Sequence, residues 1–240
     1  MTDNKTAWEE RRRAERINAL SAIRGLASDL FEMMKKRSIT NYKWPKGKIL
    51  GYRTANAAGQ AHGGFQWIEG WNEAPDWNPE PVCGGGLHFL KWGEGASGLL
   101  DWTDSATHWI VEADESETVT MDDKAKARRV YAWKFDSRQS ALEFLLQIRP
   151  ESVVHGISHH AGDESTQTAG YRSTQTAGNE STQTAGDYST FTGGIGTVQI
   201  CRYYNNDWKA SVQIVGENGV EPNLPYVCRQ GVWTRKDGER

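Results

Sequence analysis

Residues 161–192 read AGDESTQTAGYRSTQTAGNESTQTAGDYSTFT, which is one eight-residue unit written four times. A degenerate fifth copy, GGIGTVQI, follows at 193–200. Each copy carries a Ser-Thr-x-Thr segment typical of a short strand and an Ala-Gly pair typical of a turn. A period this short predicts stacked β-strands instead of paired helices. We therefore expect a short β-solenoid in which each octapeptide forms half of a coil of about 16 residues.

Alternation along each strand separates the side chains of the repeat into two sets. The serine and glutamine side chains are expected to point inward, together with Phe191 in the fourth copy. The outward set, interpreted as a binding surface, comprises Thr166, Thr168, Thr174, Thr176, Thr182, Thr184, Val198 and Ile200. The strand pattern of the repeat recurs as Ser-Val-Gln-Ile at 211–214, so the outward surface changes from threonine to aliphatic side chains. We expect the rest of the chain or a partner to cover the aliphatic end.

The stretch AGYRSTQTAGNESTQTAG at 169–186 resembles the repeat of bacterial ice-nucleation proteins, whose long arrays display Thr-x-Thr ranks. Segments 83–89, 161–200 and 215–235 together resemble uncharacterised phage and bacterial proteins with an octapeptide array. This second resemblance implies a phage or prophage origin and no established activity. Ice or ordered-water binding is a further alternative, although the four copies alternate between two faces and offer only about 100 Å² of threonine surface on each face at the usual strand spacings.

Composition excludes several classes of function. The 240 residues carry a net charge of −3, so the chain lacks the excess of positive charge that is typical of nucleic-acid-binding proteins. No apolar run approaches the ~20 residues of a membrane span, and the charged N-terminus is unlike a signal peptide. Three cysteines indicate free thiols in a reducing compartment. We expect a cytoplasmic protein without cofactor or metal, with association with a virion as an alternative.

The predicted organisation is an α+β N-terminal region with a long N-terminal helix, followed by the β-solenoid. Its four parts are an N-terminal helix at 1–40, a Trp-rich α+β domain at 41–152, the solenoid at 153–216 and a closing segment at 217–240. The helix is expected to cover residues 6–37 and to pack either on its own domain or on a partner. Elements expected in the domain are strands at Lys48–Arg53, Gly64–Glu69, Gly86–Lys91, His108–Ala113 and Arg129–Trp133, and a helix at Ser140–Ile148.

Two patterns in this domain suggest chemistry. In CGGGLHF at 83–89, Cys83 and His88 form either a nucleophile and base or a tight turn with a structural histidine. The order Gly51-Tyr52-Arg53, then Gly-Gly-Leu-His-Phe, then Glu112 or Glu115 resembles ADP-ribosyltransferases of the poly-ADP-ribose polymerase type. That resemblance implies a nucleotide site built from Arg53, His88 and one of the two glutamates.

Three histidines precede the array at His155, His159 and His160. They form either part of a zinc site, for which no third ligand is evident, or a turn or N-terminal cap of the array. The function predicted from the whole chain is a non-enzymatic interaction or structural protein whose threonine surface binds a protein partner or a second copy. A transferase-like or nucleotide-binding domain with the repeats as a recognition module is the alternative.

Overall fold

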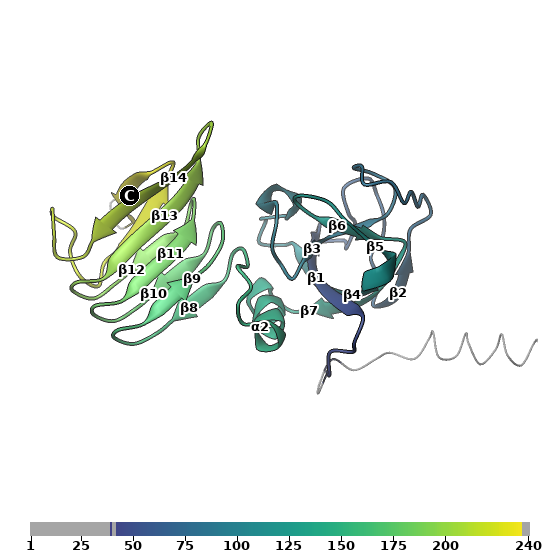
Figure 1. Cartoon of the computed structure of the whole chain (residues 1–240), viewed down its shortest axis with the longest axis horizontal. Helices are drawn as coiled ribbons and strands as arrows, with labels where there is room; N and C mark the ends of the chain where they lie inside the picture. The colour runs from purple at the N-terminus through teal and green to yellow at the C-terminus, as the bar shows by residue number, and fades with distance from the viewer. Residues whose placement is uncertain (1–38, 40–41, 237–240) are drawn as a thin grey trace, which may run out of the picture.

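The computed structural model describes residue 39 and residues 42–236 of the chain. The structure is mostly β, with 41% strand in three sheets, and α2 is the one α-helix in the described part (Figure 1). The predicted α+β class is therefore wrong. Short segments at 118–120 and 125–127 add strands to the sheet, where no strand was predicted. The long helix predicted within 1–40 lies outside the described residues.

The first sheet has seven strands in the order β2-β7-β4-β1-β3-β6-β5, and all its neighbours are antiparallel. Its strands are β1 (Lys48–Ala55), β2 (Gly70–Glu73), β3 (Leu87–Lys91), β4 (Thr107–Asp114), β5 (Thr118–Thr120), β6 (Ala125–Ala127) and β7 (Arg129–Phe135). Two 3-10 turns, η1 (Ser97–Leu99) and η2 (Glu115–Glu117), connect them. The predictions for β1, β3, β4 and β7 are confirmed to within two residues.

The strand predicted at Gly64–Glu69 is wrong. Gly63 and Gly64 have φ values of 95° and 86°, so the chain turns where the pattern suggested extension. β2 begins only at Gly70, and the preceding stretch closes a loop through the bridge between Gln60 and Gln66.

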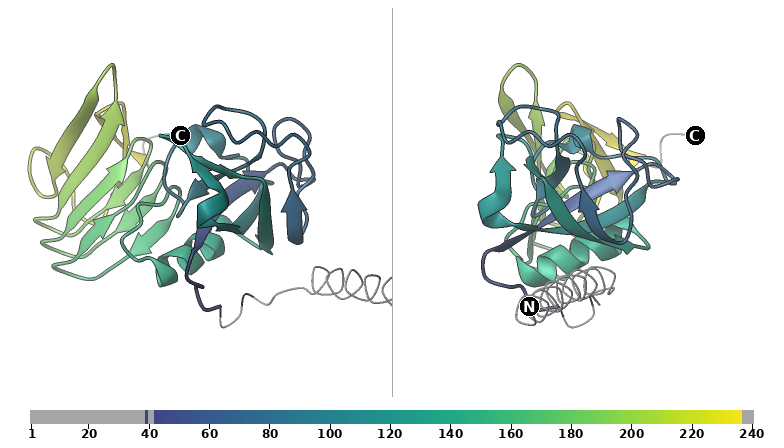
Figure 2. Two further views of the ribbon diagram at one scale, coloured as in Figure 1. Left: turned by 45° about the vertical axis from the view of Figure 1, so that its right-hand side comes forward. Right: turned by 90° about the vertical axis from the view of Figure 1, so that its right-hand side faces the viewer.

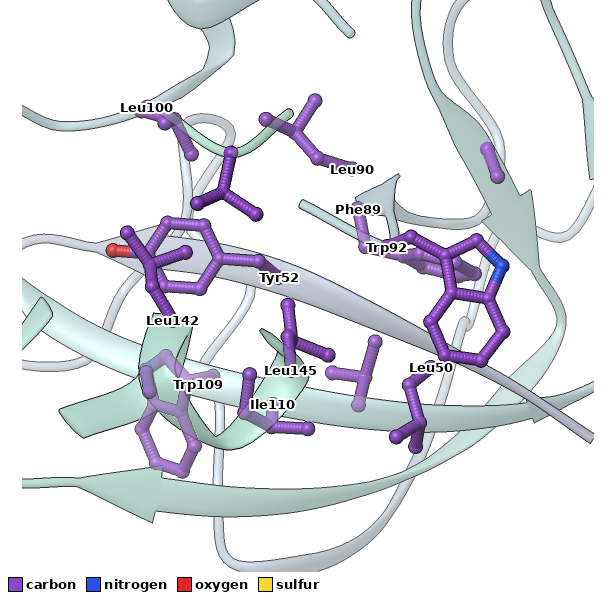
Figure 3. Packing of buried hydrophobic residues seen from close by; sticks show 14 of the residues in the cluster. Leu50, Tyr52, Phe89, Leu90, Trp92, Leu100, Trp109, Ile110, Leu142 and Leu145 are labelled. Carbon is purple, nitrogen blue, oxygen red and sulfur yellow. The ribbon is translucent and has the colours of Figure 1, made fainter. Parts of the chain in front are cut away.

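Helix α2 (Arg138–Ile148) covers one face of this sheet. It starts with a capping box in which Ser137 and Ser140 exchange side-chain and backbone hydrogen bonds. Its buried face consists of Ala141, Leu142 and Leu145. Figure 3 shows the two leucines beside Tyr52 and Ile110 in the hydrophobic core. The helix predicted at Ser140–Ile148 is confirmed.

The repeats and the closing segment form two further sheets. A five-stranded sheet has the order β16-β15-β12-β10-β8, and a four-stranded sheet has the order β14-β13-β11-β9. Their strands are β8 (Ser158–His160), β9 (Thr166–Thr168), β10 (Thr174–Thr176), β11 (Thr182–Gly186), β12 (Thr190–Thr192), β13 (Val198–Tyr204), β14 (Trp208–Ile214), β15 (Pro225–Arg229) and β16 (Val232–Arg235). Successive copies alternate between the sheets, and parallel partners such as Thr174 and Thr190 lie two copies apart.

The prediction of a β-solenoid is wrong, because these two sheets of the described residues do not form a solenoid. Only three strands in each sheet run parallel, and both sheets then continue with antiparallel strands from outside the array. The hairpin partner of β13 is β14, and β12 pairs with β15. Neighbouring strands of opposite direction end the repeat pattern in each sheet.

The orientation predicted for the repeat side chains is confirmed. Gln175, Gln183 and Phe191 are 0% exposed, and the threonines point outward. Four glutamines, of which the first three are buried, form an amide ladder in which each Nε2 donates to the Oε1 of the preceding member. The three bonds are Gln183 to Gln167 at 3.2 Å, Gln199 to Gln183 at 3.0 Å and Gln213 to Gln199 at 2.7 Å. Hydrogen bonding makes this polar interior stable.

His155 joins the repeats to the seven-stranded sheet. Its Nε2 lies 2.8 Å from the carbonyl oxygen of Gly95, and its Nδ1 accepts the Tyr171 N–H at 2.9 Å. This arrangement requires a neutral ring with the proton on Nε2. Burial accordingly lowers the pKa of His155. The Trp102 and Tyr171 rings meet edge to face at 5.4 Å across the same junction.

Candidate functional site

The structure does not bring together the four residues that the transferase resemblance implies. Arg53 Nη1 donates to the His88 carbonyl oxygen at 3.2 Å, and both residues line one cleft. Glu112 is buried and its Oε2 accepts the Tyr42 hydroxyl at 2.6 Å. Glu115 lies 3.5 Å from Lys91 Nζ. Neither glutamate lines the cleft of Arg53 and His88.

The alternation of side chains along a strand explains why Glu112 is separated from Arg53. Arg53 pairs directly with Trp109 of β4, and paired residues share one face of a sheet. Glu112 is three positions further along β4, so its side chain emerges on the opposite face. The chain order that suggested a common site is therefore compatible with two separate locations.

Cys83 and His88 line the same cleft, yet no hydrogen bond joins them in the described part of the chain. Cys83 is exposed, and its Sγ lies 3.3 Å from Lys124 Nζ. Burial lowers the pKa of His88, and the neighbouring charges of Lys124, Arg53 and Lys126 lower it further. The two residues thus lack the contact that a nucleophile and its base require.

The three histidines before the array serve the fold in different places. His155 forms the junction described above, whereas His159 and His160 lie on the edge strand β8. Burial lowers the pKa of His159. Within residue 39 and 42–236, no group of three His, Cys, Asp or Glu side chains could hold a metal ion.

The outward residues predicted as a binding surface divide between two sheets. Thr174 and Thr176 belong to the five-stranded sheet. The other six line up on the four-stranded sheet as the pairs Thr166–Thr168, Thr182–Thr184 and Val198–Ile200. A fourth pair, formed by Ile214 and Val212 of β14, continues this row. The row therefore runs from threonine at β9 to aliphatic side chains at β14.

Strand β14 is an edge of this sheet. Val198 N–H donates toward β11, to Ser181 O, at 2.9 Å, so the alternate residues Gln199 and Cys201 direct their backbone groups toward β14. Their partners are Gln213 and Ser211. The backbone groups of the alternate residues of β14, Ala210 and Val212, consequently face the open side. In the described part of the chain, neither residue has a hydrogen bond on that side.

Large apolar side chains are exposed along this edge and at the end of β13 that leads into it. Val212 is 56% exposed, Tyr204 60% and Trp208 64%. The Tyr204 and Trp208 rings contact each other at 5.8 Å near the tip of the β13–β14 hairpin. Figure 2 shows this hairpin extending beyond the other strands of its sheet. We call residues 208–214 the β14 edge, and it is the candidate interaction site.

A cleft of about 660 Å³ adjoins this edge where the repeats meet the first sheet. Its aromatic lining consists of Tyr171, Tyr188, Tyr203, Tyr204 and Trp208. The sequence patterns above did not predict this cleft, although a signal was present. Tyr171 and Tyr188 occupy variable positions in the second and fourth copies, which the alternation of copies places at one corner.

Comparisons with protein-family models, with curated proteins and with solved structures found no match for this chain. In the described part of the chain, no helix has the length and apolar character needed to cross a membrane.

Proposed function

We propose that this protein is a non-enzymatic interaction protein that pairs with a second copy through the β14 edge. The observation that supports this proposal is the coincidence of two features on one strand. The backbone groups of Ala210 and Val212 are unpaired on the open side, and the aliphatic end of the outward row lies on the same strand. The threonine end lies at β9, the opposite edge.

The β14 edge is complementary to itself. Two copies related by a twofold axis at Ser211 would align antiparallel, with Ala210 of one opposite Val212 of the other. Both residues then exchange N–H and C=O groups in each direction, which forms four new hydrogen bonds. Trp208 of one copy would lie opposite Ile214 of the other. The two four-stranded sheets would become one, with aliphatic side chains at its centre and threonines at both outer edges.

The expected affinity is modest. Each new hydrogen bond contributes about 0.5–1.5 kcal/mol, and each large apolar side chain that becomes buried contributes about 1.5–3 kcal/mol. Association itself costs about 4–15 kcal/mol. A strand of seven residues is only about 24 Å long, so the interface is at the small end of specific contacts. We expect a dissociation constant on the order of micromolar.

Sedimentation velocity over a range of protein concentrations tests the proposal. The wild-type chain should form a dimer, and Val212→Lys should leave it monomeric because charges then meet at the centre of the joint sheet. Ala210→Pro should do the same, since it removes an outward N–H and leaves the bonds to β13 in place. Thr166→Lys, at the distant β9 edge, is the matched control and should dimerise normally.

A wild-type chain that stays monomeric at about 200 µM would refute self-association with a micromolar dissociation constant. A dimer that persists in both β14 variants would place the contact elsewhere. No contact described above favours the transferase alternative, because Glu112 is engaged by Tyr42 on the other face of the sheet. Ice binding also has little support, since each sheet carries only two Thr-x-Thr ranks.

A further inference from the structure

A second cleft, of about 720 Å³, lies on the seven-stranded sheet, far along the chain from the β14 edge. Its walls come from the loop at 61–65, the glycine-rich segment at 83–88, the end of η1 and Lys124. Arg53 on β1 and Trp67 also contribute to the lining. We call it the cationic cleft, after the charge of the side chains around it.

Positive charge in the cationic cleft exceeds negative charge. Arg53 and Lys124 line it, and Lys126 supports its glycine-rich wall by donating to the carbonyl oxygens of Val82 at 2.8 Å and Gly84 at 2.9 Å. Among the described residues, none of these three cations pairs with a carboxylate. Buried or half-buried cations without a counter-charge favour an anionic ligand.

The only acidic side chain among the residues that line this cleft in the described structure is Asp76. Its Oδ1 accepts the Gly86 N–H at 3.2 Å, so it holds the glycine-rich segment in place. Gly86 itself has a φ of 136°, and a Cβ there would approach the Trp77 ring to 3.0 Å. This wall therefore has a defined shape that only glycine permits.

Buried polar atoms without a hydrogen-bond partner belong to several side chains around the same cleft. Six buried side-chain nitrogen or oxygen atoms in the described residues have no hydrogen-bond partner, and three of them belong to residues that line it. These three atoms are Arg53 Nε, Trp67 Nε1 and His88 Nε2. A buried polar atom without a partner destabilises a protein by about 1–3 kcal/mol, so three such atoms in side chains around one cleft favour a ligand there.

We propose that the cationic cleft binds a small organic oxyanion, either a phosphate ester or a carboxylate. Arg53 and Lys124 neutralise its charge, and a small adjustment of the walls brings Trp67 Nε1 and Arg53 Nε, both closed to solvent in the free protein, within hydrogen-bond reach of its oxygen atoms. The Phe65 and Trp67 rings, which contact each other at 5.5 Å, provide an apolar wall for the remainder of the ligand. This proposal is independent of pairing through β14.

Isothermal titration calorimetry on the full chain at constant ionic strength tests this site, with pyrophosphate and succinate as separate probes. At least one probe should bind with a dissociation constant below about 1 mM. Removing a charged hydrogen-bond partner should weaken that binding about 10-fold or more in Arg53→Gln, and about 5-fold in Lys124→Gln. Lys46→Gln removes the same charge before β1, at the end opposite to Arg53, and should bind as the wild type does.

The comparison of probes identifies the ligand class. Tighter binding of pyrophosphate indicates a phosphate ester, and tighter binding of succinate indicates a carboxylate. Circular dichroism checks that Arg53→Gln folds; Lys124 is partly exposed, so its variant decides the matter if Arg53→Gln does not. Absence of binding by both probes at about 10 mM overturns the proposal. Equal binding by Lys124→Gln and Lys46→Gln overturns it too.

Discussion

The buried amide ladder permits a sharp test with two substitutions of one kind. Gln183 and Gln175 are both 0% exposed, and both are the glutamine of a Ser-Thr-Gln-Thr segment. Gln183 accepts from Gln199 and donates to Gln167 within the ladder. Gln175 has no such donor, because Phe191 occupies the position two copies later, and its Oε1 is unpaired.

The two leucine variants should therefore differ in stability. Gln183→Leu leaves Gln199 Nε2 and Gln167 Oε1 without their ladder partners, while Thr192 O keeps its bond from Ala177 N–H at 2.9 Å. Two unpaired polar atoms cost about 2–6 kcal/mol together, only partly offset by burying an apolar side chain. We expect a net loss of about 2–4 kcal/mol from these terms.

Gln175→Leu creates no unpaired atom of this kind. Its Nε2 donates to Thr184 O, which also accepts the Ala169 N–H at 2.9 Å, and the substitution removes an oxygen that had no partner. Its effect should lie within about 1 kcal/mol of zero, and stabilisation is the favoured sign.

Urea unfolding followed by far-UV circular dichroism would measure both variants, with amide hydrogen exchange of residues 165–200 as a local readout. Gln183→Leu should lose clearly more free energy of unfolding than Gln175→Leu. Equal losses in the two variants, or a larger loss in Gln175→Leu, would show that ladder hydrogen bonds do not stabilise the interior.

Two further predictions concern the packing of the repeats. A Cβ at Gly186 would lie 2.8 Å from Tyr171 N, so Gly186→Ala should lower the free energy of unfolding by about 1–3 kcal/mol in the same urea experiment. Gly162 occupies the equivalent position of the first copy and has open space around it, so Gly162→Ala should have little effect. Burial lowers the pKa of His155 below its unfolded value of about 6.5. The contribution of neutral His155 to the free energy of unfolding is therefore complete above about pH 6.5 and is lost as the pH falls through the folded pKa. The reason is that a protonated ring cannot accept the Tyr171 N–H. A urea midpoint that is unchanged between pH 7.5 and pH 5 would contradict this pH dependence.

Local sequence patterns predicted the parts of the fold that depend on neighbours along the chain. Strands β1, β3, β4 and β7 and helix α2 follow from periodicity and turn residues. The prediction failed at Gly64–Glu69, because Gly63 and Gly64 have positive φ and produce a turn at its start. It failed also for the overall class, because short strands such as β5 and β6 have no periodicity to detect.

The candidate sites required information that chain order does not contain. Arg53 and His88 converge, but the position of Glu112 depends on the register between β1 and β4, and a shift of one residue reverses the face on which a side chain emerges. Trp67 and Lys124 join the cationic cleft from other segments, and no spacing in the sequence relates them to Arg53.

The amino-acid sequence by itself determined the eight-residue period of the repeats and the division between inward Ser and Gln and outward Thr. Both are local consequences of a strand that alternates its side chains. Tertiary structure alone decided that antiparallel strands such as β14 and β15 would end the parallel pairing, and hence that the β14 edge stays open. Strand pairing between distant segments, such as Thr192 with Pro225, depends on which surfaces meet when the chain collapses, and not on the residues next to them.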